Sequence, residues 1–311
     1  SEFIRVQCRL ARMSKWDPEW GPLKTREAEL LSANVDRWNL AVTGINPDVI
    51  SDVRYERGVI TGVQLRLEEP GSRFTTFASD LFDAAPLLTK LSLRCWTESD
   101  WRDLLASPVS HRIEEIELGN RGSMDDYLDI LLASKDLPSL RRLILWKGQI
   151  DDAGIIRLAQ SSLGQRLTHL ALHASTTHER IPDDVLASIG GMPGLRKLCY
   201  RGSRTIIRPE AFLEAGSSMR LEALDLSGHN LEDGGAGIQS LLAAPTFAGL
   251  RSLNLSVTGL RDLQGITSSP HLGQLQKLSL NRNGLVDRDV ETLWDSPVLD
   301  GVEELELQGN R

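Results

Sequence analysis

The chain has 311 residues, of which 41% are hydrophobic and 25% charged, and its formal net charge is −8. This composition excludes a disordered protein, because enough apolar side chains are present to bury a substantial core. The negative balance argues against a surface built throughout for nucleic acid, although it is compatible with a local basic patch.

Cysteine usage and hydropathy indicate the compartment. Cys8, Cys95 and Cys199 are odd in number, lie far apart and form no C-x-x-C pair, which favours a reducing compartment over a disulfide framework or a zinc site. No apolar run approaches the roughly 18 residues of a membrane span. The first residues, SEFIRVQCRLARM, alternate charged with apolar side chains instead of forming a signal-peptide core. We therefore expect a cytoplasmic protein without a membrane role.

Residues 1–55 are expected to form a helical N-terminal cap in front of a repeat domain over residues 56–311. SEFIRVQCRLARM and KTREAELLSANVDRWNLAV have the spacing of amphipathic helices, and SKWDPEWGP separates them. The first unit of a repeat array exposes apolar core, so these helices are expected to cover it. A separate docking or targeting role is the alternative.

The remainder of the chain is repetitive. A frame of three residues, spaced as apolar, two others, apolar, one other, apolar, recurs ten times at intervals of 25 to 29 residues. The frames are Ile60/Val63/Leu65, Leu88/Leu91/Leu93, Ile113/Ile116/Leu118, Leu140/Leu143/Leu145, Leu167/Leu170/Leu172, Leu195/Leu198/Tyr200, Leu221/Leu224/Leu226, Leu250/Leu253/Leu255, Leu275/Leu278/Leu280 and Val302/Leu305/Leu307. Intervening segments such as DDAGIIRLAQSSL, PDDVLASIGG and VDRDVETLWDS begin with acidic residues and have helical apolar spacing. Each unit is therefore predicted to be strand, turn and helix.

The stretches LEALDLSGHNLEDGGAG and LQKLSLNRNGLVDRDVETL resemble leucine-rich repeats of the long, ribonuclease-inhibitor-like type. The resemblance covers about residues 60 to 311. It implies an α/β solenoid of about ten repeats, a horseshoe with a parallel β-sheet on the concave face and helices on the convex face.

The N-terminal segment resembles the short repeat-companion domain that precedes leucine-rich repeats in some bacterial proteins. The matching residues are Phe3, Ile4, Val6, Gln7, Leu10, Ala11, Arg12, Arg26, Glu27, Leu30, Leu31 and Trp38. That family has further helices before EFIRVQ, and no helix follows the last strand at LQGNR, so a fragment of a longer protein, or a deliberately trimmed chain, is expected.

Leucine-rich repeats often place an asparagine shortly after the third frame residue, where its amide satisfies backbone groups between turns. Asn283 and Asn310 match that pattern. Other residues occupy the equivalent place in earlier repeats, namely Trp96, Gly148, Ser175, Ser203, His229 and Thr258. The asparagine ladder is therefore expected to be incomplete.

Familiar catalytic patterns do not occur. The sequence has no GxxxxGK[ST] loop, no GxGxxG after a strand, no HExxH and no GxSxG. The glycines of EDGGAGIQ precede a predicted helix, where they serve chain reversal better than phosphate binding. We expect no enzyme activity, no catalytic residues and no cofactor within this chain.

The remaining candidates for chemistry are His169, His173 and Cys199. His169 and His173 share a strand face but lie about 13 Å apart along it, too far to hold one metal ion, and His178 lies across a loop, so no metal site is expected. Cys199 has His173 and Asp225 on adjacent strands, which invites a catalytic triad. The offset from His173 puts the pair beyond hydrogen-bond reach, although a thiol among cations could be partly ionised.

Two acidic rungs are predicted on the strand face. Glu114, Glu115 and Glu117 form one rung, and Glu303, Glu304 and Glu306 form another. Solvated charge is the expected role of both, and a docking site for a basic partner is the alternative.

The fourth to sixth repeats combine apolar and basic side chains. Positions three, five and seven, counted from the first frame residue, face outward, and neighbouring strands stack about 4.8 Å apart. LRRLILWKG, LTHLALHAS and LRKLCYRGS contain six Lys or Arg and no Asp or Glu. Position three gives Arg142, His169 and Lys197, position five Ile144, Ala171 and Cys199, and position seven Trp146, His173 and Arg201, with Arg141, Lys147 and Arg196 alongside.

An apolar strip with an aromatic anchor and a cationic border is typical of a protein-binding surface. The predicted site consists of Arg142, Ile144, Trp146, His169, His173, Lys197 and Arg201, and its border favours an acidic or mixed-surface protein partner. A scaffold that binds protein is therefore predicted. Trp146 has an alternative role, lying flat over His173 or Arg201. Binding of nucleic acid by the basic rungs, and recognition on behalf of catalytic sequence outside this chain, are the alternative functions.

Overall fold

The structure is a computed structural model that describes residues 1–15, 17–67, 73–119, 125–134, 137–146, 150–173, 179–214 and 216–311. The chain divides into two compact units, which we describe separately. Unit 1 comprises residues 1–120 and 134–139, and unit 2 comprises residues 121–133 and 140–311.

Unit 1 begins with two helices and continues with a four-stranded sheet. Its elements are α1 (Glu2–Leu10), α2 (Trp20–Thr43), β1 (Ile50–Glu56), β2 (Val59–Arg66), η1 (Phe74–Thr76), α3 (Ala78–Ala84), β3 (Lys90–Arg94), α4 (Glu98–Ala106), η2 (Ser110–Arg112) and β4 (Glu115–Leu118). The strand order is β1-β2-β3-β4, with β1 antiparallel to β2 and the other pairs parallel. Helix α2 starts at Trp20, inside the expected linker, and Pro22 is tolerated there because the first turn needs no N–H bond.

Strand β1 was not expected. Residues 50–55, assigned to the helical cap, form instead the first arm of a hairpin with β2. Arg57 and Gly58 make the turn with φ values of 51° and 80°, the left-handed pair that a tight antiparallel hairpin requires. The Arg-Gly pair between two β-branched stretches was the signal that could have revealed it.

Unit 2 alternates short strands with helices. Its elements are α5 (Asp125–Ala133), β5 (Arg142–Leu145), α6 (Asp152–Gln160), α7 (Ser162–Arg166), β6 (His169–His173), α8 (Asp183–Gly190), β7 (Lys197–Arg201), β8 (Ile206–Ile207), η3 (Pro209–Leu213), β9 (Ala223–Asp225), β10 (Asn230–Leu231), η4 (Glu232–Gly235), α9 (Ala236–Leu242), η5 (Pro245–Phe247), β11 (Ser252–Asn254), α10 (Gln264–Thr267), β12 (Lys277–Ser279), α11 (Asp287–Trp294), η6 (Pro297–Gly301) and β13 (Glu304–Glu306).

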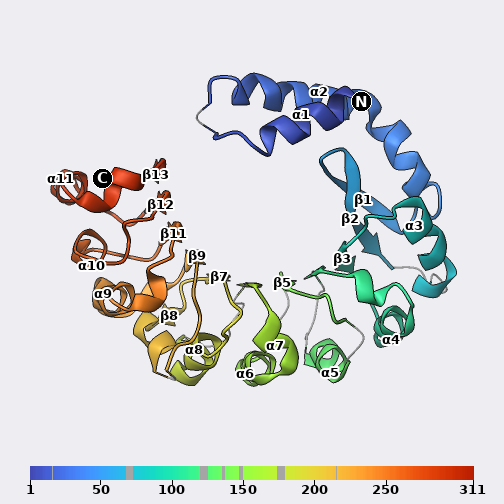
Figure 1. Ribbon diagram of the computed structural model, residues 1–311. Coiled ribbons are helices and arrows are strands. Elements are labelled where there is room, and N and C mark those ends of the chain that lie inside the picture. The colour runs from blue at the N-terminus through green and yellow to red at the C-terminus, as the bar shows by residue number, and fades with distance from the viewer. Residues whose placement is uncertain are drawn as a thin grey trace. The chain divides into compact units, whose positions relative to one another are not determined.

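The strands of unit 2 form a parallel sheet in the order β5-β6-β7-β9-β11-β12-β13, and the helices lie on one side of it (Figure 1). The register aligns the middle residue of each frame with that of the next, so Leu198 pairs with Leu224, which pairs with Leu253. One strand and one helical segment per repeat, stacked in register, make a leucine-rich-repeat solenoid, and the predicted fold class is confirmed.

The frame residues form the core. Every frame residue from Leu88 to Leu280 is at most 5% exposed. Those of the tenth frame, Val302, Leu305 and Leu307, are only half-buried. These frames bury about 24 large side chains at regular intervals. The hydrophobic effect therefore requires an apolar residue at each frame position, whereas the residues between the frames can vary.

The two predicted asparagines join successive turns. The Oδ1 atom of Asn283 accepts hydrogen bonds from the N–H groups of Thr258 (2.9 Å) and Leu260 (3.4 Å), and its Nδ2 donates to the carbonyls of Leu255 and Leu280. Asn310 repeats this arrangement one turn later. Trp96, His229 and Thr258 are buried in the equivalent places and Ser203 is exposed, whereas Gly148 and Ser175 lie outside the described residues.

Candidate functional site

The open face of unit 2 is the face of its sheet opposite the helices. On strands β5, β6 and β7 the register aligns Arg142 with His169 and Lys197, and Ile144 with Ala171 and Cys199. His173 pairs with Arg201, and Trp146 follows the end of β5. All seven residues of the predicted site therefore belong to three neighbouring strands or their immediate continuation. Lys147, which was expected to flank them, lies outside the described residues.

His169 occupies the middle of a cationic row. Partial burial and the positive charges of Arg142 and Lys197 lower its pKa to about 4, against a weaker opposing effect of Glu222. Lys197 is exposed, and no ion pair joins it to a carboxylate within the described part of the chain. Burial, with the two neighbouring cations, therefore favours the neutral imidazole at this row.

The second row is packed around Trp146. The half-buried indole lies 6.0 Å from the His173 ring, and the Arg201 guanidinium lies 5.8 Å from the indole centroid. Arg201 also donates to Asp225 on β9 at 3.0 Å. The indole thus has the neighbours that the flat-packing alternative named, and the arginine that borders it carries a compensated charge.

The environment of Cys199 disfavours the reactive thiolate form of its side chain. Burial, followed by the charge of Asp225, raises the pKa of its thiol to about 11. Its Sγ lies 3.9 Å from Asp225 Oδ2, with the thiol as donor. The His173 side chain is in register with Arg201, two residues beyond Cys199, so the three groups do not assemble as a nucleophile and base.

The acidic rung in unit 1 is an ion-pair network, and its expected role as solvated charge is wrong for Glu115 and Glu117. Both are buried on β4 at 9% and 8% exposure. Glu117 accepts from Arg54 at 2.7 Å and from Arg94 at 3.0 Å, and Arg54 lies 3.9 Å from Glu115. Glu114 is exposed.

The acidic rung in unit 2 is also internally matched. Lys277 on β12 donates to Glu304 at 2.6 Å and to Glu306 at 3.1 Å. The nearby Ser279 hydroxyl, followed by Lys277, lowers the pKa of Glu306 to about 2. These carboxylates therefore bind a lysine on a neighbouring strand of the same chain.

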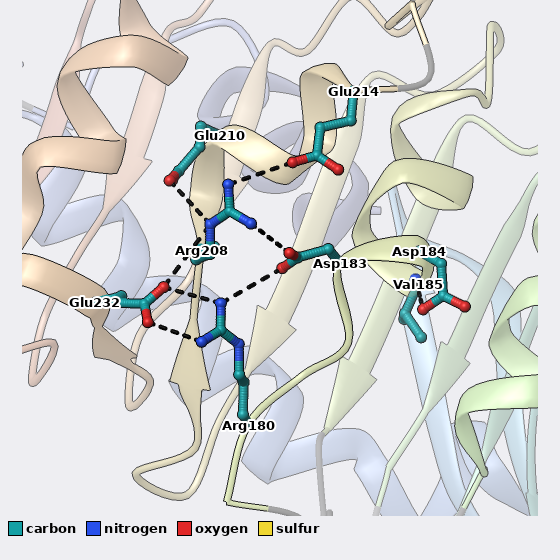
Figure 2. Close-up of polar contacts among 8 residues, drawn as sticks. All are labelled: Arg180, Asp183, Asp184, Val185, Arg208, Glu210, Glu214 and Glu232. Atoms are coloured by element: carbon teal, nitrogen blue, oxygen red, sulfur yellow. Dashed lines mark hydrogen bonds and ion pairs between the residues drawn. The ribbon is translucent and has the colours of Figure 1, made fainter.

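A larger polar cluster was not foreseen from the sequence. Arg180, which precedes α8, donates to both carboxylate oxygens of Glu232 at 2.8 and 2.9 Å. Arg208 donates to Glu210 at 3.2 Å, to Glu214 at 3.3 Å and to Asp183 (Figure 2). The cluster links the turns of three consecutive repeats beside the parallel pair β8 and β10. The recurrence of RIPDD and RPEAF one repeat apart was its signal.

Other candidate chemistry finds no support in the geometry. Gly234 and Gly235 have φ values of 68° and 126°, so they reverse the chain before α9. Across the described ranges, no three His, Cys, Asp or Glu side chains gather closely enough to hold a metal ion. None of the helices in the described part of the chain has the length and apolar character needed to cross a bilayer.

Comparison with known proteins gives structural likeness at low identity. No protein-family model and no curated protein matches the chain. Among solved structures, it is similar to the yeast Rad7 and Elc1 complex (15% identity, 99% of this chain, 67% of that chain, TM-score 0.46). It is also similar to the TLR13–ssRNA13 complex, at 18% identity over 79% of this chain and 36% of that chain, with a TM-score of 0.44. The internalin inlF from Listeria monocytogenes matches at 15% identity over 87% of this chain and 88% of that chain, with a TM-score of 0.35. The chain spans about a third of the length of the TLR13 chain.

Proposed function

We propose that this chain is a non-catalytic module that binds a protein partner through the open face of unit 2. The carrying observation is the register that places Arg142, His169 and Lys197 in one row beside the apolar strip of Ile144 and Ala171. A row of basic side chains next to apolar surface and an aromatic ring suits a partner with an acidic or mixed surface.

The geometry favours protein over nucleic acid. Nucleotide bases bind by stacking on open aromatic faces, whereas the Trp146 ring is already flanked by Arg201 and His173. A phosphate backbone that continued along the sheet would next meet Asp225 and Glu222. The patch is therefore bounded by negative charge on its C-terminal side, which suits a compact acidic segment better than a long polyanion.

The proposal also covers the role of the N-terminal helices, the cellular compartment and the class of repeat. Phe3 of α1 is buried against Trp38 of α2 and Tyr55 of β1, with ring centroids 4.8 and 5.9 Å away, which supports a capping role for the N-terminal helices as a repeat-companion-like segment. The three cysteines are thiols, which supports a reducing, cytoplasmic environment in a bacterium. The long, ribonuclease-inhibitor-like class of repeat belongs to the same proposal.

The test is partner capture from native cytoplasm with the full-length protein. Trp146→Ala and Arg142→Glu are expected to lose the wild-type partner, because one removes the aromatic anchor and the other reverses the charge of the row. Arg251→Glu, a charge reversal at an exposed position outside the patch, is expected to retain it. Unchanged far-UV circular dichroism establishes that each variant is folded.

Retention of the partner by both patch variants would exclude this surface. Nucleic-acid binding makes a different prediction: a random oligonucleotide would bind with a steep loss of affinity between low and moderate salt. Absence of oligonucleotide binding at low salt would dismiss that alternative.

A further inference from the structure

We infer that Val257 is a contact residue for a protein partner, and that it receives an aliphatic side chain of an acidic segment held between Arg204 and Arg282. This inference rests on the proposed function, protein binding by unit 2, and adds to it a second contact surface. That surface lies in the turns after β7, β9, β11 and β12, apart from the outward side chains of the predicted patch.

Val257 has a backbone conformation that valine rarely adopts. Its φ is 59°, in the left-handed region, where a β-branched side chain is strained. The equivalent residues of the turns after β9 and β13 are Gly228 and Gly309, with φ values of 81° and 73°. Glycine meets the requirement of this turn without strain, so valine costs stability here. Strain that the surroundings impose on one residue is typical of positions with a functional role.

Hydrogen bonds between successive turns hold Val257 in this conformation. Its N–H group donates to the Asn281 carbonyl at 2.8 Å, and the Gly228 N–H donates to the Ser256 carbonyl at 3.0 Å. These bonds continue the ladder of the sheet into the turns, so the left-handed residues of successive turns stack about 4.8 Å apart. The backbone at Val257 therefore cannot relax without loss of the ladder.

The Val257 side chain gains little burial in return for this strain. It is 44% exposed, whereas the frame residue Leu255, two positions earlier, is fully buried. On one side it adjoins Gly228, which has no side chain. On the other side the Arg282 side chain lies along the following turn, where a Cβ atom on Gly309 would approach its Cγ to 2.8 Å. The methyl groups of Val257 are therefore left exposed to solvent.

Two arginines border this valine. Arg282 is the next residue of the stack, and Arg204, also left-handed with φ at 67°, donates its N–H to the Gly228 carbonyl at 2.7 Å. Both arginines are exposed, and over the described residues neither forms an ion pair with a carboxylate. An apolar contact between two cations favours a segment in which an aliphatic side chain is flanked by carboxylates.

The spacing of the turns fits an extended segment. Arg204 follows β7 and Val257 follows β11, two strands further along the sheet, or about 10 Å away. The Arg282 side chain reaches the level of β13, about as far on the other side. In an extended chain, residues three apart also span about 10 Å. A leucine over Val257 therefore brings acidic residues two and three positions away within reach of both arginines.

The experiment uses the full chain and a capped, fluorescently labelled peptide, Glu-Glu-Ser-Leu-Ser-Glu-Glu. Fluorescence anisotropy measures the affinity of the protein for this peptide at low salt. A second peptide has serine in place of leucine and tests the apolar contact, and a third has lysine in place of every glutamate and tests the charges. Each is expected to bind about tenfold more weakly than the parent peptide, or not at all.

Substitutions of Val257 separate a contact from a purely structural role. Val257→Gly is expected to raise the urea midpoint, because it relieves the strain, and to weaken peptide binding by about tenfold. Val257→Thr keeps the branched shape and the strain but replaces a methyl group with a hydroxyl, so it should weaken binding by about threefold without raising the midpoint. Arg57→Gly, which relieves a left-handed position in the hairpin of unit 1, is the matched control and should keep the affinity within about twofold.

Substitutions of the arginines test the charged border. Arg282→Ala and Arg204→Ala are each expected to weaken peptide binding by about threefold and to reduce its dependence on salt. Arg251→Ala removes an exposed arginine at the opposite end of β11 and is expected to change neither quantity.

The outcomes distinguish this inference from the proposed function. The inference is overturned if the parent peptide fails to bind, if Val257→Gly keeps the wild-type affinity, or if Val257→Gly lowers the urea midpoint. In each of these cases, loss of partner capture by Trp146→Ala and Arg142→Glu would still support protein binding by the open face. Retention of the partner by those two variants, together with the expected peptide results, would instead assign protein binding to the turns around Val257.

Discussion

At the scale of single residues, His229 fills by packing the place that Asn283 takes in a later turn. Its ring is fully buried, stacks edge-on against Tyr200 at 5.2 Å and lies directly over Gly202. A Cβ atom on Gly202 would approach His229 Nδ1 to 2.2 Å, so the glycine is needed for the ring to fit. Burial lowers the pKa of His229 to about 4, partly opposed by the backbones of Thr205 and Tyr200.

This burial predicts acid sensitivity. The unfolded chain protonates His229 near its ordinary value of 6.5, whereas the folded chain resists protonation until about pH 4, so the unfolded state binds more protons between these values. The contribution of His229 to stability is complete above pH 6.5 and is lost as the pH falls to 4, amounting to about 3 kcal/mol. Between pH 7 and pH 4.5, wild type is expected to lose about 2 kcal/mol more than His229→Asn in urea unfolding.

His229→Asn is a suitable comparison because Asn283 occupies the equivalent position of a later turn. Carboxylates such as Glu306 titrate in both proteins and cancel in the difference. Parallel pH profiles for the two proteins would show that His229 is not the source of the acid sensitivity.

At the scale of the element, strand β4 depends on charge pairing as well as on its frame residues. Ile116 and Leu118 face the core, while Glu117 sits between two arginines from β1 and β3. The network joins a hairpin strand outside the repeat frame to the first regular repeats. A buried carboxylate between two half-exposed guanidinium groups is worth more than a surface pair, because removal of one partner leaves the others without compensation.

Glu117→Gln is therefore expected to destabilise the protein by about 2 kcal/mol, with a lower urea midpoint and an unchanged slope. The matched control is Glu114→Gln, an exposed glutamate three residues earlier, for which the change is expected to stay within about 0.5 kcal/mol. Equal effects of the two substitutions would mean that the pairing seen at Glu117 contributes no more than a solvated charge.

At the scale of the whole molecule, stability should be local to neighbouring repeats. Each inner strand of the long sheet in unit 2 contacts the strands before and after it, as Leu253 does with Leu224 and Leu278. In such an array, stability is approximately a sum of repeat and nearest-neighbour terms. A core lesson in one repeat should therefore weaken adjacent strands most.

Leu253→Ala removes a fully buried side chain and is expected to cost about 3 kcal/mol. Hydrogen exchange should then quicken most in β9, β11 and β12, and least in α1 and α2 of unit 1. Ser252→Ala, on the same strand but on the opposite face, is the control and should leave exchange unchanged. Uniform acceleration across both units after Leu253→Ala would contradict the nearest-neighbour description.

The sequence by itself determined where the strands of the repeat frames lie and which of their side chains are buried. The spacing of Leu143, Leu145 and their counterparts suffices for this, because alternation along a strand and stacking between repeats convert period directly into burial. The repeat spacing also predicted that Arg142, His169 and Lys197 align on neighbouring strands. The observed strand register pairs Arg142 with His169 and His169 with Lys197.

The tertiary structure decided which charges are compensated. Arg180 meets Glu232 across 52 residues and Arg54 meets Glu117 across 63, in both cases through turns or a hairpin that no frame specifies. The reason is physical: backbone periodicity fixes the direction of side chains on regular strands, whereas the reach of a long arginine depends on turn conformations that vary from repeat to repeat. The positive row on the open face could be identified in the sequence, but which carboxylate each of these long arginines meets follows only from the folded turns and the hairpin.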